Sequence, residues 1–408
     1  MAKEEKKAPK LRFNGYTNDW ERKKLGILIT RVKSYPLSRS VEVKKETDVK
    51  YVHYGDIHTN IADEIDKNNN LPFINEIYKE YDELKLDDVI VADASEDYKG
   101  IADAAVIISN LPYTIIAGLH TIALRPTSLI KGYFLYHIFK TENFKRFGYK
   151  IGTGLKVFGI SYNNLAKYKV YYPQEIEEQE KIIGILSNLT NSINLHEDHL
   201  QFLHSFKSFL LQKMFFDNDI PPLLRFNKFT EKWNQCRLND HAIVTMGQSP
   251  NSKNYTNNQT DKILVQGNAD LYKNKVLKRV FTTEITKTAV KNDILISVRA
   301  PVGDIARNQY ESVVIGRGIA SIKGNDFLYY QLEKMKNSGF WNKYIAGSTF
   351  ESITGKDLKN AKIYTTNSDE ERKISNIFSS LTKIIQLQEH KIDSLKKLKQ
   401  FLLQNMFI

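Results

Sequence analysis

The chain has 408 residues, of which 41% are hydrophobic and 26% are charged, and it carries a formal net charge of +12. This composition is typical of a globular protein and excludes a disordered or fibrous chain. The single cysteine, Cys236, excludes an intrachain disulfide framework and a Cys-rich zinc site. We find no apolar run long enough for a transmembrane helix, and residues 1–10 lack the apolar core of a signal peptide. We therefore expect a cytoplasmic protein without a membrane partner.

The positive charge is the first indication of a partner. It favours nucleic acid, because phosphate groups attract lysine and arginine. The alternative is that a chain rich in lysine and asparagine is basic through biased codon usage, and net charge alone does not separate the two.

The chain repeats one plan twice, and the first repeated piece follows residues 1–10, for which we expect a flexible tail. Residues 11–25 match residues 224–238 in a Leu-Arg-Phe-Asn start, a threonine, a tryptophan and a leucine, at a constant offset of 224 − 11 = 213. Such self-similarity is the mark of a duplicated architecture.

The first globular unit is predicted for residues 11–172. Its β-rich segments are residues 50–57, 87–93 and 121–126, and residues 131–147 have a helical pattern. Strands and helices are mixed, so the predicted fold class is α+β.

Residues 173–216 are predicted to form a first long spacer helix. Apolar residues from Ile182 to Met214 recur at steps of three, four and seven, which is typical of a helix that packs against another helix. At about 1.5 Å per residue, this helix would be roughly 55–60 Å long. One small domain cannot bury an apolar stripe of that length.

A linker at residues 217–223 leads into the second globular unit, predicted for residues 224–366. Strands are expected at residues 262–270, 292–299 and 311–316, and a helix is expected at residues 325–344.

The second long helix is predicted for residues 367–408. Residues 370–407 align without a gap with residues 178–215, at an offset of 370 − 178 = 192. Ser368 supplies an N-cap, and acidic residues fill the first turn.

Two equivalent helices in one chain most simply pack on each other. An antiparallel, coiled-coil-like pair would relate the two globular units by a pseudo-two-fold axis. The alternative is that each helix recruits another chain. Four phenylalanines off the repeating seam leave apolar surface for a further partner: Phe202, Phe206, Phe209 and Phe401.

No catalytic pattern is present in the sequence. We find no GxxxxGK[ST] loop, and the short pieces Gly152-Thr-Gly154 and Gly316-Arg-Gly318 are expected to be turns. Residues 220–223 lack the flanking residues of the amino-methyltransferase motif, and the nine histidines have no metal-ligand spacing. We therefore expect no catalytic residue, no metal and no bound cofactor.

The tandem order of variable unit and long helix resembles the specificity subunit of type I restriction–modification systems, over residues 11–408. LRFN with a following tryptophan precedes each unit, and residues 160–165 and 353–358 precede each long helix. FLLQKMF and FLLQNMF close the two helices. GSTFESIT and SVRAPVGD are also similar to the target-recognition domains of that family.

This resemblance implies that each unit is a target-recognition domain for one half of a split, asymmetric DNA sequence. The helices would set the spacing and dock two modification (methyltransferase) subunits, and restriction subunits would complete an ATP-dependent nuclease. S-adenosylmethionine, ATP and Mg²⁺ would be bound by those partners and not by this chain.

Polar and basic loop residues are the candidates for contact with double-stranded DNA, because such side chains bind phosphates and base edges. In the second unit they are Gln248, Ser249, Lys253, Arg299, Arg317, Ser348 and Thr349. In the first unit they are Arg31, His53, Tyr54, His120, Thr153 and Lys156. The alternative for any one of them is an ordinary polar loop.

Two other functional classes stay open. A stand-alone DNA methyltransferase or nuclease with a degenerate site would act on DNA without any partner. A protein scaffold with incidental basicity would bind without salt dependence or sequence preference.

Overall fold

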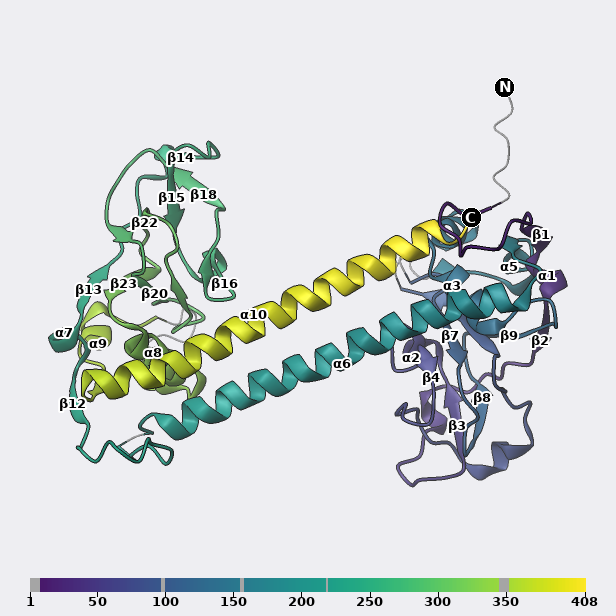
Figure 1. The fold of residues 1–408 in the computed structure, drawn as a ribbon, viewed down its shortest axis with the longest axis horizontal. Coiled ribbons are helices and arrows are strands. Elements are labelled where there is room, and N and C mark those ends of the chain that lie inside the picture. The colour runs from purple at the N-terminus through teal and green to yellow at the C-terminus, as the bar shows by residue number, and fades with distance from the viewer. Residues whose placement is uncertain (1–7, 97–99, 155–157, 218, 345–351) are drawn as a thin grey trace. The chain divides into compact units, whose positions relative to one another are not determined.

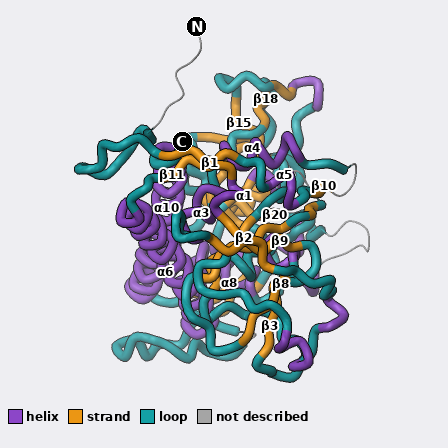
Figure 2. The backbone as a smooth tube through the Cα atoms, turned by 90° about the vertical axis from the view of Figure 1, so that its right-hand side faces the viewer, coloured by secondary structure: helices purple, strands orange, loops and turns teal. Residues whose placement is uncertain are grey.

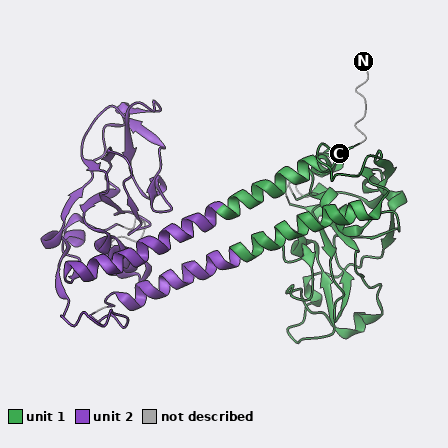
Figure 3. Cartoon of the chain, viewed as in Figure 1, with its two compact units in different colours: residues 1–196, 391–408 green, residues 197–390 purple. Residues whose placement is uncertain are grey.

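The computed structural model describes residues 8–96, 100–154, 158–217, 219–344 and 352–408 (Figure 1). The chain divides into two compact units (Figure 3). Unit 1 comprises residues 1–196 and 391–408, and unit 2 comprises residues 197–390. Both units mix helices and strands, which Figure 2 colours separately, so the predicted α+β class is confirmed.

The centre of unit 1 is a five-stranded sheet with the order β2-β9-β5-β7-β4. Its strands are β2 (Ile29–Val32), β4 (Glu64–Ile65), β5 (Val89–Ala92), β7 (Ala104–Ile107) and β9 (Thr121–Pro126). Val89 and Val91 pack in one apolar cluster with helix α3 (Gly132–Phe139), and Ile90 between them packs in another with Ile57. Alternate side chains of β5 therefore face two cores, which explains why its sequence is apolar throughout.

Short elements complete unit 1. Three further strand pairs are β1 (Glu21–Lys24) with β11 (Lys169–Tyr172), β3 (Val49–Val52) with β8 (Thr114–Ala117), and β6 (Ala94–Ser95) with β10 (Phe158–Gly159). The remaining elements are α1 (Leu25–Leu28), η1 (Arg39–Val41), α2 (Tyr54–His58), η2 (Glu76–Glu80), α4 (Glu142–Ile151) and α5 (Tyr162–Leu165).

Unit 2 has two sheets. The six-stranded sheet contains β13 (Ile243–Met246), β23 (Ile319–Lys323), β20 (Ile294–Ser297), β21 (Ile305–Arg307), β17 (Lys275–Val276) and β16 (Leu271–Tyr272), in that order. The five-stranded sheet contains β14 (Tyr255–Thr256), β18 (Val280–Thr282), β15 (Lys262–Val265), β22 (Ser312–Ile315) and β19 (Thr288–Val290).

The other elements of unit 2 repeat the frame of unit 1. β12 (Asn234–Arg237) pairs with β24 (Lys362–Thr365) immediately before a long helix, as β1 pairs with β11. In chain order, the helices α7, α8 and α9 of the second repeat correspond to α1, α3 and α5 of the first. Their bounds, with those of the 3₁₀ turns, are α7 (Leu238–His241), η3 (Ser252–Asn254), η4 (Asn268–Asp270), α8 (Asp326–Asn337), η5 (Phe340–Tyr344) and α9 (Gly355–Lys359).

Several predicted elements are shorter than expected. The strand predicted for residues 50–57 ends at Val52, because His53 caps a helix instead of continuing the strand. Asp56 accepts the His53 main-chain N–H at 2.8 Å, and His53 Nδ1 accepts the Gly55 N–H at 3.2 Å. This reciprocal capping box starts α2 and makes the second half of that prediction wrong.

Polar side chains likewise end the other predicted segments early. The single helix predicted for residues 131–147 is two helices, since Thr141 caps α4 by accepting the Phe144 N–H at 3.4 Å. In residues 262–270 the strand ends at Val265, because Asp270 accepts the N–H of Gln266 at 2.8 Å. The helix predicted for residues 325–344 stops at Asn337 and continues as the 3₁₀ turn η5.

The two long helices are α6 (Ile176–Met214) and α10 (Ser368–Asn405). In unit 1, Leu402 of α10 lies in the same apolar cluster as Leu186 of α6. In unit 2, Leu203 of α6 lies in one cluster with Leu381 and Ile385 of α10. No helix within the described ranges is long and apolar enough to cross a membrane.

A buried ion pair joins each long helix to its globular unit. Glu178, 1% exposed in the first turn of α6, accepts two hydrogen bonds from Arg12 at 2.7 and 2.9 Å and one from Trp20 Nε1 at 3.3 Å. In unit 2 the same three residue types repeat the arrangement. Glu370, fully buried in α10, accepts Arg225 at 2.6 and 2.8 Å and Trp233 Nε1 at 3.2 Å. The repeated LRFN and tryptophan pieces therefore hold the start of each helix.

We predict that Arg225→Ala lowers the free energy of unfolding by about 3–5 kcal/mol, because it leaves the buried Glu370 carboxylate without its ionic partner. Urea denaturation of the full chain measures this loss. The matched control is Arg372→Ala in the same turn, since Arg372 and its partner Asp369 are exposed. Its expected cost is about 0–1 kcal/mol, and equal losses in the two variants would contradict the assignment.

The ion pair between Arg225 and Glu370 also makes the stability of unit 2 depend on pH. Burial alone would raise the pKa of Glu370, but the hydrogen bonds from Arg225, Thr366 and Trp233 outweigh burial and lower it below its ordinary value of 4.5. The stability that this carboxylate contributes is therefore complete above about pH 4.5 and is lost as the pH falls below it.

Candidate nucleic-acid interface

Four chain segments of unit 2 meet where strands end: the loop after β13, the end of β15, the turn between β22 and β23, and the end of β20. Main-chain hydrogen bonds of 2.8–3.1 Å join them. These bonds run from Gly247 N to Ile319 O, from Gly316 N to Val265 O, from Gly318 N to Gln266 O, and from Val298 N to Gly318 O. Predicted DNA contacts from separate parts of the sequence are thereby brought to one place.

Glycines allow these segments to approach so closely. A Cβ atom on Gly318 would lie 2.3 Å from the carbonyl oxygen of Gln266, and one on Gly247 would lie 2.1 Å from that of Gly316. The Gly316-Arg-Gly318 piece is thus a close-packed turn, as predicted. It presents Arg317 between Gly318, where a Cβ has no room, and Gly316, where a Cβ would be a tight contact at 3.1 Å.

Arg317, Ser249 and Gln248 are neighbours in this arrangement. The Arg317 N–H donates to Ser249 Oγ at 3.1 Å, and the Gln248 N–H donates to the Ile315 carbonyl at 2.9 Å. The side chains of Gln248 and Arg317 are exposed and that of Ser249 is half-buried. Their backbones are fixed while polar groups stay accessible, which suits recognition of a ligand.

Arg299 follows Val298 at the end of β20 and is exposed. Its backbone forms a β-bridge with Ser352. The preceding Val298 N–H donates to the carbonyl oxygen of Gly318, in the turn Gly316-Arg317-Gly318 that we call the arginine turn. No carboxylate in the described part of the chain pairs with Arg299 or Arg317. Two exposed guanidinium groups that have no carboxylate partner among the described residues make this edge of unit 2 attractive to an anion.

Lys253 lies in the exposed turn η3 (Ser252–Asn254). Glu284 fixes this turn, since its Oε2 accepts the Asn251 N–H and the Asn254 side chain, both at 2.7 Å. These hydrogen bonds hold the pKa of Glu284 below its usual value. The lysine is therefore carried on an ordered turn and can reach outward.

Gln266 and Tyr255 belong to the same place but were not predicted. Tyr255 OH donates to Gln266 Oε1 at 3.4 Å, and Gln266 packs against the glycines of the arginine turn. Composition does not distinguish Gln266 from any other polar residue after a strand. Only the hydrogen bonds between strand ends place it beside Arg317.

Unit 1 contains a cavity of about 590 Å³ near several of its predicted contacts. Its lining residues are Arg39, His53, Tyr54, Gly55, His58, Thr59, Ser95, Glu96, Gly100 and Asp103. Two of the predicted contacts, His53 and Tyr54, line it. A third, His120, contacts Tyr54 with a ring separation of 5.3 Å.

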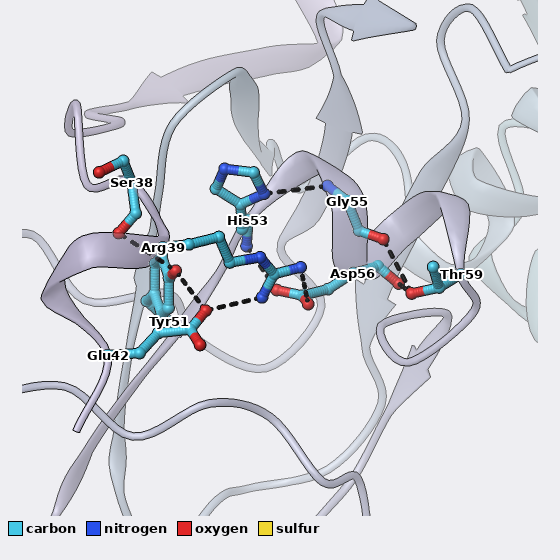
Figure 4. A network of polar contacts seen from close by, with 8 residues as sticks. All are labelled: Ser38, Arg39, Glu42, Tyr51, His53, Gly55, Asp56 and Thr59. Carbon is cyan, nitrogen blue, oxygen red and sulfur yellow. Dashed lines mark hydrogen bonds and ion pairs between the residues drawn. The ribbon is translucent and has the colours of Figure 1, made fainter. Parts of the chain in front are cut away.

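One wall of the cavity is a polar network around Arg39 (Figure 4). Its guanidinium donates to Glu42 Oε1 and to Asp56 Oδ1, both at 2.8 Å, and Tyr51 OH donates to the same Glu42 oxygen at 2.8 Å. Asp56 is also the residue that caps α2. Two carboxylates thus neutralise Arg39, so it positions the wall and is not a free phosphate ligand.

His53 is buried at the start of α2, and burial together with the positive charge of Arg39 lowers its pKa. Its Nδ1 accepts the Gly55 N–H, so the neutral ring carries its proton on Nε2. Tyr54 lies 4.5 Å from this ring and 5.8 Å from that of His58. The cavity therefore offers imidazole, phenol and carboxylate groups, which can hydrogen-bond to base edges.

The other first-unit candidates lie near the cavity or apart from it. Thr153 bridges Gly159, which pairs with Ala94 beside the cavity residue Ser95. Arg31 is exposed on β2, with its guanidinium 5.2 Å above the Tyr162 ring. Three candidates lie outside the described residues: Lys156, Ser348 and Thr349.

The apolar candidates are exposed. The exposed fractions of Phe202, Phe206, Phe209 and Phe401 lie between 41% and 61%. Phe202 and Phe206 stack at 6.0 Å on α6. Within the described ranges, His, Cys, Asp and Glu side chains form no group of three that could hold a metal ion.

The fold and these loops define a class: a duplicated α+β protein in which each copy presents polar and basic groups beside a long helix. The family model described as the type I restriction modification DNA specificity domain matches residues 17–204 and again residues 230–397. The chain belongs to this family.

The comparisons with single proteins agree. A protein of Methanocaldococcus jannaschii, provisionally named the type I restriction enzyme MjaX specificity subunit, is 28% identical over 75% of this chain and 74% of its own length. The solved structure of a type I restriction-modification S subunit from M. genitalium is 14% identical. It covers 98% of this chain and 99% of that one, with a TM-score of 0.62. A chain from a structure describing complex assembly and conformational transition of the type I R-M system is 20% identical, covers 95% and 97%, and has a TM-score of 0.59.

We predict that Gly318→Ala destabilises unit 2 by about 1–3 kcal/mol, because its methyl group has no room against Gln266. Gly267→Ala is the matched control, since a Cβ there meets nothing within 4 Å. Thermal unfolding of the two variants measures the difference. Equal melting temperatures would show that the turn is not close-packed.

Proposed function

We propose that this chain is the DNA-binding specificity subunit of a type I restriction–modification complex and that it reads a bipartite, asymmetric target. The observation that carries the proposal is the double match to the DNA specificity domain within one chain. Each copy would read one half of the target. Because the two copies differ in sequence, the two half-sites would differ.

The proposed domain boundaries follow the repeat. Target-recognition domains would span residues 11–172 and 224–366, and the spacer helices would span residues 173–216 and 367–408. Residues 1–10 would be a tail and residues 217–223 a linker. The strand pairs β1–β11 and β12–β24, each immediately ahead of a long helix, support these limits.

The two spacer helices would pair along their length as an antiparallel, coiled-coil-like unit with pseudo-two-fold symmetry. The helix contacts inside each compact unit support this pairing. Half-sites on one face of B-DNA lie about 34 Å apart, and a 39-residue helix of about 58 Å can span that distance.

The loops of both units would contact double-stranded DNA. In unit 2 the proposed contacts are Gln248, Ser249, Lys253, Arg299 and Arg317, and in unit 1 they are Arg31, His53, Tyr54, His120 and Thr153. The main support is that Arg299 and Arg317 are exposed and have no carboxylate partner in the part of the chain that the structure describes, since Arg binds both phosphate and guanine.

Methylation and cleavage of DNA would be carried out by partner subunits in the cytoplasm. Phe202, Phe206, Phe209 and Phe401 form exposed apolar surface on which two methyltransferase subunits could dock. Those subunits would bring S-adenosylmethionine, and restriction subunits would bring ATP and Mg²⁺. The chain itself would not be an enzyme.

An exchange of recognition domains tests the modular reading. We predict that replacing residues 11–172 with those of a relative changes one half of the methylated sequence and leaves the other half and the gap unchanged. Sequencing of methylated DNA from cells carrying the hybrid measures both. A change in both halves, or in neither, would contradict two independent recognition domains.

Arg299→Ala tests the proposed interface in unit 2. If Arg299 contacts a guanine bidentately, the variant loses about 1–3 kcal/mol in binding of target relative to random DNA. Competition binding at fixed salt concentration measures this ratio. Lys291→Ala is the control, because Lys291 is exposed and paired with Glu311. An unchanged ratio for Arg299→Ala would remove it from the interface.

A further inference from the structure

Two lysines occupy equivalent places in the repeated helices. Lys207 of α6 and Lys399 of α10 are separated by 399 − 207 = 192 residues, which is the offset of the helix repeat. Thr190 and Thr382 have the same separation, 382 − 190 = 192. A lysine and a threonine are thus repeated together.

In unit 1 this lysine and threonine meet across the two helices. Lys399 Nζ donates to Thr190 Oγ1 at 2.7 Å, and the Thr190 hydroxyl lies 3.3 Å from Glu64 Oε1. The other oxygen of Glu64 accepts Tyr133 OH at 2.6 Å. A continuous polar path therefore joins α10, α6, strand β4 and helix α3.

Because Lys399 and Glu64 are removed from water, their charged forms depend on nearby partners for stabilisation. Burial lowers the pKa of Lys399 and raises that of Glu64, since both groups are removed from water. An ammonium in this environment is stabilised only while its partners hold their positions.

In unit 2 the equivalent lysine meets the globular part directly. Lys207 is buried, donates to Glu333 Oε1 of α8 at 2.7 Å, and lies 5.5 Å from the Tyr330 ring centre. Lys207 and Thr382 both line a cavity of about 270 Å³. Glu333 Oε2 and Thr382 Oγ1 are buried there without a partner in the described part of the chain.

The two lysines have one feature in common. Lys399 is on α10, which begins in unit 2, yet its ammonium contacts unit 1. Lys207 is on α6, which begins in unit 1, yet its ammonium contacts unit 2. Each helix therefore carries an ammonium whose contacts lie in the compact unit at the helix's far end. Lys207 is buried and reaches Glu333 directly, while Lys399 is half-buried and is linked to Glu64 through Thr190.

We propose that Lys207 and Lys399 are positioning residues that fix the register of the two helices against the recognition units and so set the length of the gap between half-sites. The inference rests on the proposed function. A single buried polar group at a helix seam is the best-attested way to specify register, because a slipped register leaves it unpaired.

The geometry predicts what a slip would do. A shift of one heptad moves a helix by about 10.5 Å, which corresponds to about three base pairs at 3.4 Å each. A register that is no longer fixed would admit targets whose gap differs by up to about that number.

Methyl transfer to a set of duplexes tests the proposal. The duplexes carry the half-sites of the wild-type chain and gaps one to three base pairs shorter or longer, and the assay uses the full chain with its methyltransferase partner. We expect Lys207→Met and Lys399→Met to lower the preference for the wild-type gap about tenfold. Lys397→Met is the matched control, because Lys397 is exposed and its ion pair with Asp393 lies within its own helix.

Further variants separate positioning from folding. Lys207→Arg keeps the charge, and the adjoining cavity gives it room, so it should retain the single gap. Glu333→Gln removes the partner charge at constant size and should broaden the gap even if Lys207→Met does not fold. An unchanged gap in Glu333→Gln, or equal broadening in Lys207→Arg and Lys207→Met, would overturn the inference.

The result for the wild-type chain separates this inference from the proposed function. If the wild-type chain directs methylation to no bipartite duplex at any gap, the proposed function fails and this inference fails with it. If the wild-type chain and both methionine variants select the same single gap, only this inference is overturned.

Discussion

A buried carboxylate at the start of each long helix is the constraint on which the rest of the structure depends. Glu178 and Glu370 are removed from water, and each is satisfied by an arginine fork and a tryptophan N–H from the segment that opens its unit. A buried carboxylate without such partners would be costly, so the opening segment has to lie at the helix start. This buried ion pair then fixes the position of the strand pair that precedes the helix and of the helix itself.

The frame fixed in this way carries loops that differ between the two units. In unit 2 the strand ends are joined so tightly that only glycine fits beside Arg317, whereas in unit 1 a network around Arg39 shapes an open cavity. One frame therefore supports two chemically different surfaces. Two unlike surfaces agree with the proposal that each unit reads a different half-site.

The repeat made the frame predictable from sequence, while local polar contacts made the details unpredictable. Both long helices were predicted correctly because apolar periodicity determines them, and the strand at residues 121–126 was predicted correctly from its β-rich composition. The segment 50–57 was misread, because a capping box formed by His53 and Asp56 overrides its β-rich composition. Arg39 and Gln266 were missed because their places depend on partners distant in sequence, which no local pattern reveals.

The central claim is that this chain alone decides which DNA sequence its complex modifies. The most direct measurement is genome-wide mapping of DNA methylation in the host, with and without this chain. The account predicts that one asymmetric motif, two unlike half-sites separated by a single fixed gap, loses methylation on both strands when the chain is removed. Unchanged methylation, or the loss of a contiguous motif, would contradict it.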